Sequence, residues 1–327
     1  MNFFTHIFIV FNWVIFSLVS TSLIASDKLD TNSYFFFFKH LIYILIGIFI
    51  IFIFSSINRD KLFKYSIILF FISLISLSLV PIIGIEVKGS KRWIDLFFLP
   101  RFQPIELLKP FLIIILASIL ASNKNSNLYL KYLLSIVIIS TISLFLIMQP
   151  DIGQTLLVIF SWGVLIFTSG INIFFLLVFA IFLSILITFL IIYVPRFDYI
   201  QGRIFSFFNR DTGAHNFQSD KAIDSIVSGG FFGKGIGEGT LKNRVPEAHT
   251  DYIISVISEE FGVIAIMLIL LLFLILIYRV LKKVNYEKNE KAKLVLIGCV
   301  SLILMQVTIH VGVNIRLFPT TGMTLPF

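Results

Sequence analysis

Nine long apolar runs constrain the fold of this chain more than any other feature. A membrane-spanning helix needs about 20 mostly apolar residues, and each run reaches or approaches that length. The runs cover residues 7–25, 35–56, 62–84, 105–121, 132–148, 154–169, 172–194, 253–278 and 294–315. We therefore predict an all-α, polytopic transmembrane bundle that forms a single domain over residues 1–327. The abrupt ending after 321–326 suggests that a tenth helix is missing.

The composition excludes a water-soluble protein. Apolar residues make up 58% of the chain and charged residues only 13%, whereas soluble domains have about 25% charged residues. The formal charge of +8 does not indicate nucleic-acid binding, because the basic residues lie in short segments between the apolar runs. The single cysteine, Cys299, excludes a disulfide framework and a CxxC zinc site.

The basic residues predict the orientation in a bacterial inner membrane. The segments 57–64, 122–131 and 279–293 carry an excess of Lys and Arg and lie on the same side if the helices alternate. The positive-inside rule assigns that side to the cytoplasm. The segment 195–252, between the seventh and eighth helices, is then a large extracytoplasmic loop. The segment 85–104 is basic yet outside, so its charges need a functional or packing reason.

The loop 195–252 contains seven basic and seven acidic residues together with apolar anchors, which predicts an ordered, functional loop. Its glycine-rich run at 229–239 superficially resembles a phosphate-binding loop. No strand precedes the run, however, and Lys234 is followed by Gly instead of Ser or Thr. The glycines are better explained as tight turns against the bilayer.

Ionisable residues at membrane depth are costly and usually functional. Glu106 and Lys109 are spaced i, i+3 at the start of a helix, just after Gln103, and this spacing puts them on one face. They form either a simple helix-start ion pair or a pair that lines a polar cavity. Asp151 joins the fifth and sixth helices and either caps the sixth or faces the same cavity.

A second group of ionisable residues closes the large loop. Glu247, His249 and Asp251 precede the eighth helix, which leaves three interpretations: a metal site, a helix cap at Asp251, or an active carboxylate at the membrane surface. Glu259 and Glu260 lie about 12 Å deeper along that helix. They are too far away to act on the same atom, so we interpret at least one as a buried structural anchor.

Six ordered motifs make the chain resemble the SEDS family of FtsW, RodA and SpoVE proteins, and FtsW most. The motifs are KGSKRWID at 88–95, RFQPIELLK at 101–109, QPDIG at 149–153, PEAHTDY at 246–252, EEFG at 259–262 and TGMTLPF at 321–327. Three departures are visible. The chain has Lys221-Ala222 where the family often has Gln-Ser, so no role is carried over to these residues. The family has Phe where this chain has Tyr252, and its Ser-Tyr-Gly-Gly stretch after Leu-Pro-Phe is absent, as expected for a C-terminally truncated chain.

The resemblance implies a peptidoglycan glycosyltransferase that polymerises lipid II, the undecaprenyl-diphosphate disaccharide pentapeptide, with inversion at the anomeric carbon. It implies that Asp251 is the general base. Candidate groups for the diphosphate are Arg203, Lys109, Arg92 and a divalent cation, Mg²⁺ or Mn²⁺, in that order. The expected substrate-cavity residues are Arg92, Gln103, Glu106, Lys109, Asp151, Arg203, Glu247 and His249. The expected partners are a class B penicillin-binding transpeptidase and other division proteins at the septum.

Two other functions also fit a helical membrane protein with internal polar residues. A lipid II flippase requires a polar path that reaches the cytoplasmic half of the bundle. A membrane scaffold of the division machinery does not require the carboxylates of Glu106, Asp151 or Asp251. The motif residues gather in the outer half, and this favours the enzyme.

Overall fold

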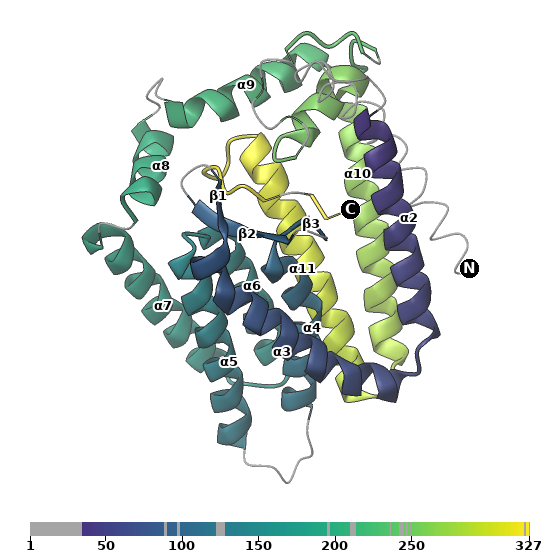
Figure 1. Cartoon of the computed structure of the whole chain (residues 1–327), viewed down its shortest axis with the longest axis vertical. Coiled ribbons are helices and arrows are strands. Elements are labelled where there is room, and N and C mark those ends of the chain that lie inside the picture. Colours follow the sequence, from purple (N-terminus) through teal and green to yellow (C-terminus); the bar gives the residue numbers. More distant parts are fainter. Residues whose placement is uncertain are drawn as a thin grey trace. The chain divides into compact units, whose positions relative to one another are not determined.

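The computed structural model describes residues 35–327 apart from 88–89, 97–98, 122–127, 195–196, 210–213, 236, 242–244, 246–247, 249, 324 and 327. Ten helices and three short strands form in these residues (Figure 1). The helices are α2 (Phe35–Ser56), α3 (Arg59–Ile83), α4 (Pro104–Leu120), α5 (Leu128–Met148), α6 (Ile152–Thr168), α7 (Ile173–Tyr193), α8 (Asp198–Asn209), α9 (Ala214–Gly229), α10 (Ile253–Tyr286) and α11 (Glu290–Asn314). The strands are β1 (Ile85–Val87), β2 (Ser90–Leu96) and β3 (Leu99–Phe102).

The predicted all-helical membrane architecture is confirmed. Eight of the nine apolar runs fall in the described residues and each forms a helix, whereas the run 7–25 lies outside them. Within the described part, four helices are long and apolar enough to cross a bilayer: α3, α5, α10 and α11. Helix α10 extends to Tyr286, beyond the predicted end at 278, because its basic last turns continue the helix past the apolar run.

The chain divides into two compact units. The first unit contains residues 1–57, 205–274 and 306–327, and the second contains 58–204 and 275–305. The prediction of a single domain over residues 1–327 stays a prediction.

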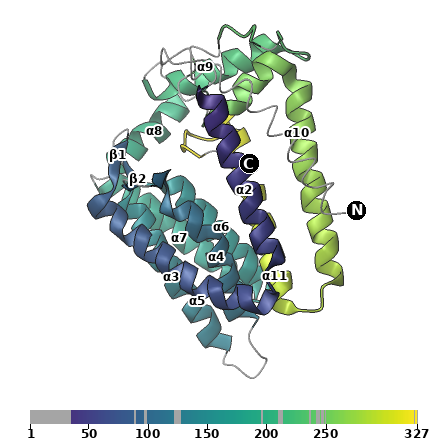
Figure 2. The same cartoon turned by 45° about the vertical axis from the view of Figure 1, so that its right-hand side comes forward.

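The second unit is built around α4. Figures 1 and 2 both show α3, α4, α5 and α6 side by side, and α4 packs against the other three. Leu108, Leu112 and Leu116 follow one face of α4 and are buried in the shared core. On α6, the Trp162 indole Nε1–H donates to Ser135 Oγ of α5 at 3.2 Å, which satisfies its polar group inside the apolar core.

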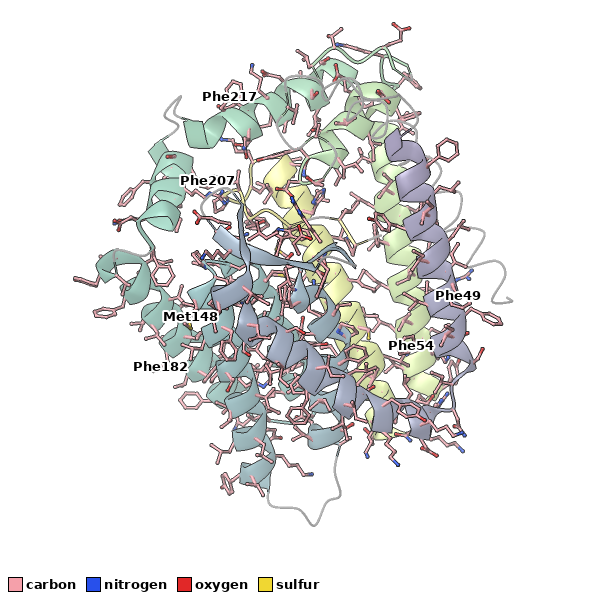
Figure 3. All side chains as sticks on the ribbon, in the orientation of Figure 1. Phe49, Phe54, Met148, Phe182, Phe207 and Phe217 are labelled. Atoms are coloured by element: carbon pink, nitrogen blue, oxygen red, sulfur yellow. The ribbon has the colours of Figure 1, made fainter. Side chains whose placement is uncertain are left out.

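The outer surface is apolar, as lipid contact requires. Phe182 of α7 is 61% exposed and points outward (Figure 3), and Phe49 of α2 is 63% exposed. In water, such a continuous apolar surface would be unfavourable by about 25 cal/mol per Å². The abundant Phe residues therefore serve as lipid-facing surface.

The segment 85–104 forms a small antiparallel sheet that the sequence analysis did not predict. Strand β1 pairs with β2, with Ile85 opposite Trp93, and β2 pairs with β3, with Ile94 opposite Phe102. The sheet also explains the basic charges on the predicted outer side. Arg101 pairs with Asp95 at 2.9 Å, and Arg92 pairs with Asp151 at 3.6 Å.

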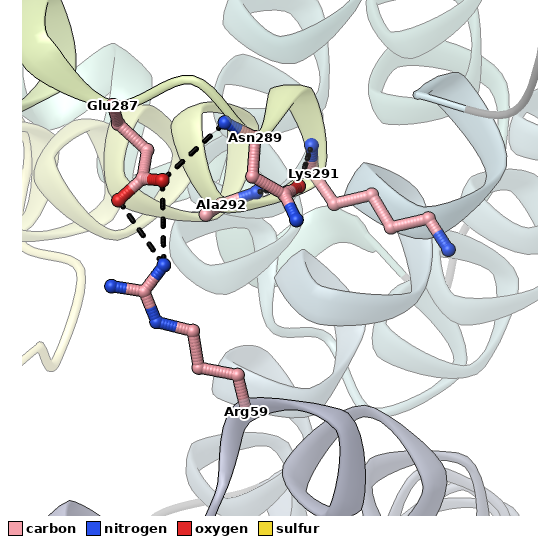
Figure 4. Close-up of polar contacts among 5 residues, drawn as sticks. All are labelled: Arg59, Glu287, Asn289, Lys291 and Ala292. Carbon is pink, nitrogen blue, oxygen red and sulfur yellow. Dashed lines mark hydrogen bonds and ion pairs between the residues drawn. The ribbon is translucent and has the colours of Figure 1, made fainter.

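The segments 57–64 and 279–293, both predicted to be cytoplasmic, lie at the same end of the second unit. Arg59 of α3 pairs with Glu287 at 3.2 Å, just after α10 ends (Figure 4). Asn289 then caps α11, because its Oδ1 accepts the backbone N–H groups of Lys291 and Ala292 at 3.0 and 3.2 Å. The contact agrees with the orientation inferred from the basic residues.

Candidate active site

The predicted Glu106–Lys109 pair is formed at the start of α4. Pro104 occupies the first turn, where its missing N–H costs no helical hydrogen bond. One turn on, Lys109 Nζ lies 2.6 Å from Glu106 Oε2. The Lys109 side chain is only 6% exposed, whereas that of Glu106 is 42% exposed. The cation is therefore enclosed by protein, and the carboxylate is the member that surrounding molecules can reach.

Asp151 takes the first of the two roles that the sequence left open, the helix cap, while the cavity-facing role stays a prediction. It is the N-cap of α6, and its side chain accepts the Gln154 backbone N–H at 3.4 Å. It also lies 3.6 Å from Arg92 Nε and accepts Gln103 Nε2 at 3.0 Å. Asp151 lies in the turn between α5 and α6, outside both helices. Its burial raises the pKa of the carboxyl above 3.8, and the Arg92 guanidinium opposes that rise.

Gln154 joins these contacts into one network. Its Nε2 donates to Glu106 Oε1 at 2.7 Å, and its backbone N–H binds Asp151. The network thus runs from Lys109 through Glu106, Gln154 and Asp151 to Arg92. The sequence analysis missed Gln154 as a site residue, although its position one turn after the capping Asp151 was a usable signal.

The positive and negative charges within this network are balanced, and this balance limits which ligands it can bind. The carboxylates of Glu106 and Asp151 are each paired with a cation, Lys109 and Arg92. The described residues contain no group of three His, Cys, Asp or Glu side chains arranged to hold a metal ion. The network therefore does not fit Mg²⁺ or Mn²⁺. Its exposed carboxylate is suited to accept hydrogen bonds from hydroxyl or amide groups.

In the first unit, Asp251 occupies the turn before α10 and is half-buried. Its backbone carbonyl accepts Asn314 Nδ2 from the end of α11 at 3.1 Å, and Asn314 is fully buried. Of the other predicted residues, Glu247 and His249 lie outside the described residues, and Arg203, which belongs to the second unit, lies half-buried on α8. The prediction that one cavity joins these residues to the network of the second unit stays a prediction.

Glu259 and Glu260 have the surroundings expected of structural anchors. Glu259 is 0% exposed and accepts Ser225 Oγ and the Leu241 backbone N–H, both at 2.9 Å. Glu260 is 1% exposed and accepts the Gly237 backbone N–H at 3.3 Å. Both carboxylates are directed toward the backbone of the glycine-rich run.

Comparison with known proteins identifies the family. The FtsW/RodA/SpoVE model, described as "Cell cycle protein", matches residues 1–327. A "Probable peptidoglycan glycosyltransferase FtsW" from Francisella salina is 33% identical over 97% of this chain and 80% of the relative. One from Coxiella burnetii is 30% identical over 95% of this chain and 85% of the relative.

Two solved structures share the fold. One is described as "Structural coordination of polymerization and crosslinking by a peptidoglycan synthase complex"; it has a TM-score of 0.74, 25% identity, and covers 96% of this chain and 89% of its own. The other is a point mutant of the rod shape determining protein RodA from Thermus thermophilus, with a TM-score of 0.70, 25% identity, and coverage of 98% and 88%. The chain belongs to the FtsW/RodA/SpoVE family.

Proposed function

We propose that this chain is a peptidoglycan glycosyltransferase that polymerises lipid II at the outer face of the inner membrane, with Asp251 as its general base. The observation that carries the proposal is the match of the whole chain to the family, with relatives named peptidoglycan glycosyltransferase at 30–33% identity. In the reaction, Asp251 takes the proton from the acceptor 4-hydroxyl. The oxygen then attacks the anomeric carbon of the donor, and the diphosphate leaves from the opposite face.

The fixed backbone of Asp251 supports a base at this position. A general base must stay within hydrogen-bonding distance of the proton it removes. Asn314 holds the Asp251 carbonyl, and the adjacent Tyr252 is 1% exposed. The backbone on the C-terminal side of Asp251 is thereby restrained, and the residue stays half-buried.

The leaving diphosphate requires positive charge. Lys109 and Arg92 are poorly placed to supply it, because their side chains are 6% and 14% exposed and are paired with carboxylates. We therefore favour Arg203 among the three candidates. Glu106, the exposed member of the network, is then suited to accept hydrogen bonds from sugar hydroxyl or amide groups.

The distribution of polar groups in the second unit favours polymerisation over lipid transport. The network occupies the start of α4 and of α6, at the end opposite the basic segments 57–64 and 279–293. Towards those segments the buried side chains of the described helices are mostly apolar, including Leu116, Ile139 and Leu165, with a few polar ones such as Ser66, Lys131 and Ser135. A flippase would need polar groups along that path.

We further propose a class B penicillin-binding transpeptidase as partner, together with other division proteins at the septum. The peptidoglycan synthase complex that shares this fold supports the transpeptidase. A divalent cation remains a proposal for the segment 247–251, and the described residues of that segment do not form a metal site by themselves.

The test compares Asp251→Asn with Asp224→Asn in the chain assembled with its transpeptidase. Asn caps a helix as well as Asp but cannot accept the proton. We expect glycan synthesis from purified lipid II to fall by about 10²–10⁴ in the Asp251 variant. Asp224 lies on α9, 52% exposed and paired with Lys221, so the same substitution there should leave synthesis unchanged. Glycan of normal length and rate from Asp251→Asn would contradict the assignment and direct attention to Asp151 and Glu247.

A further inference from the structure

Helix α10 is broken at Gly262, and the two parts have different surroundings. Gly262 has φ 79° and ψ 175°, which no helix accommodates. Every residue from Tyr252 to Glu260, before the break, is buried in protein. After the break the surface is apolar and exposed, as at Met267 (64%) and Leu274 (58%). The break therefore separates a protein-enclosed segment, next to Asp251, from the lipid-facing part of the helix.

A break of this kind frees backbone groups. In a continuous helix the N–H groups of Val263 and Ile264 would bind the carbonyls of Glu259 and Glu260, four residues earlier. The segment from Ile253 to Phe261 rises about 12 Å, so these groups lie about two turns past the start of the helix, where Glu259 and Glu260 are buried and Ile264 is part of the apolar surface. Unpaired backbone groups at such depth cost several kcal/mol each.

The glycine-rich segment 229–241, called the glycine latch below, pairs all four groups. The N–H groups of Lys234 and Gly235 donate to the carbonyls of Glu259 and Glu260 at 2.9 and 3.0 Å. Two further bonds run in the opposite direction. The N–H of Val263 donates to the Gly230 carbonyl at 3.0 Å, and that of Ile264 donates to the Phe231 carbonyl at 3.4 Å. The latch thus replaces the two helical hydrogen bonds that the break removes.

This close approach explains the glycines. A Cβ on Gly229 would lie 2.0 Å from the Ser258 carbonyl oxygen, and one on Gly233 would lie 2.2 Å from that of Glu260. A Cβ on Gly262 would lie 2.1 Å from the Phe231 carbonyl oxygen. Gly233 and Gly262 also have positive φ, which side chains rarely adopt. The run is therefore a backbone-packing motif.

Glu259 binds residues on both sides of the glycine-rich run. Its carboxylate accepts the Ser225 hydroxyl, which precedes the latch, and the Leu241 backbone N–H at its end. Lys234, in the middle of the latch, has its Nζ 3.6 Å from Glu259 Oε1. One buried carboxylate therefore contacts the segment before, within and at the end of the latch.

We propose that the glycine latch and Glu259 position Asp251, so that Glu259 and Gly233 are positioning residues for the base. The proposal rests on the proposed function of Asp251. The enclosed segment of α10 is held at its start by the bond from Asn314 to the Asp251 carbonyl, and at its end by the latch. Releasing the latch removes the restraint at the far end of this segment and displaces the carboxylate.

Two glycines of the latch provide a matched test. Gly233 and Gly237 have similar φ angles, 78° and 82°. A Cβ on Gly233 meets the Glu260 carbonyl, whereas a Cβ on Gly237 meets no atom within 4 Å. Gly233→Ala and Gly237→Ala therefore introduce the same backbone strain, and only the first forces the latch from the helix. Both are compared with wild type in the chain assembled with its transpeptidase.

The measurements are amide hydrogen exchange and the pH dependence of lipid II polymerisation. For Gly233→Ala we expect faster exchange in peptides covering 234–235 and 263–264. We also expect a rate about 10- to 100-fold lower and a displaced midpoint of the acid limb, because the base has moved relative to its surroundings. For Gly237→Ala the midpoint should equal that of wild type. A smaller folded fraction would lower the polymerisation rate by the same factor at every pH and leave the midpoint unchanged.

Three outcomes would overturn the proposal: equal effects of the two substitutions, faster exchange with an unmoved midpoint, or no change in exchange. If Gly233→Ala does not accumulate in membranes, Ser225→Ala replaces it, because it removes one donor to Glu259 without adding an atom. An unmoved midpoint in that variant also overturns the proposal. Full activity of Asp251→Asn would refute the base assignment, whereas the exchange data test the latch independently.

Discussion

Glu106 and Glu259 are carboxylates in membrane helices of the two units, yet their surroundings differ. Glu106 is paired with the Lys109 ammonium and the Gln154 amide, and 42% of its side chain is exposed. Glu259 is bound by a hydroxyl and a backbone N–H and lies 3.6 Å from the Lys234 ammonium, with no exposed surface. The hydrogen-bonding capacity of Glu259 is used by the fold, whereas Glu106 retains accessible oxygen. Accessibility to another molecule therefore separates the candidate site residue from the structural one.

The largest expected effect comes from making the same substitution at both positions. Glu259→Gln keeps one acceptor oxygen but places an NH₂ group against a hydroxyl or an N–H, leaving a buried donor unpaired. The cost is on the order of 1–3 kcal/mol of folding stability. Glu106→Gln can keep the bond from Gln154, and water that reaches residue 106 partly replaces the counter-charge lost to the buried Lys109 ammonium, so its stability cost should be smaller than that of Glu259→Gln.

Melting temperatures and polymerisation rates of the two variants measure this difference. We expect Glu259→Gln to lower the melting temperature more, and Glu106→Gln to lower the rate without a comparable loss of stability. Equal losses of stability at both positions would mean that Glu106 is as much a part of the fold as Glu259.

Asp151 is an intermediate case in this comparison, because it is buried like Glu259 but belongs to the same network as Glu106. Burial raises the pKa of its carboxyl above 3.8 in the folded state. The folded state then binds more protons than the unfolded state between 3.8 and the raised value, so stability falls as pH rises through that window. Asp151→Asn keeps the helix cap and removes this titration.

Melting temperatures of wild type and Asp151→Asn should therefore diverge as pH rises from 4, with wild type declining relative to the variant. Parallel curves would show that the Arg92 guanidinium fully offsets the burial of Asp151. Polymerisation by the same variant shows separately whether the charge of Asp151 is needed for catalysis.

The sequence predicted those features that depend on local pattern. Apolar length located α2 to α7, α10 and α11, and the i, i+3 spacing predicted the contact between Glu106 and Lys109. The structural role expected for Glu259 agrees with its contacts. Each of these features follows from residues close together in the chain and from the cost of placing charge in lipid.

Features that depend on pairing between distant segments were not predicted. The short sheet at 85–102 pairs neighbouring strands, but its two outer strands have only three and four residues, too few for a periodic pattern. The bond from Gln154 to Glu106 joins residues 48 positions apart. The break at Gly262 gave no signal either, because a single glycine is tolerated in a helix. Only the four bonds from the latch make the break stable, and those partners lie about 30 residues earlier in the chain.

The smallest expected effect is at the ion pair between Arg59 and Glu287 (Figure 4). Arg59 is 61% exposed, so water and salt screen its attraction to Glu287. The pKa of Glu287 lies below its usual value. The hydrogen bond from the Asn289 backbone N–H is the largest cause, and the Arg59 guanidinium lowers the pKa further. Any stabilisation is therefore present at neutral pH and lost as pH falls through the lowered pKa.

Glu287→Gln removes the charge but can still accept the Asn289 N–H. We expect no resolvable change in melting temperature at 0.15 M salt, a small decrease at low salt, and unchanged polymerisation. Glu287 is 14% exposed and its cation 61% exposed, so the contrast with Glu259→Gln compares a carboxylate whose partner is in water with one that is fully enclosed. A large, salt-independent loss at Glu287 would show that the contact between α3 and the end of α10 holds the second unit together, and that exposure alone does not rank these carboxylates.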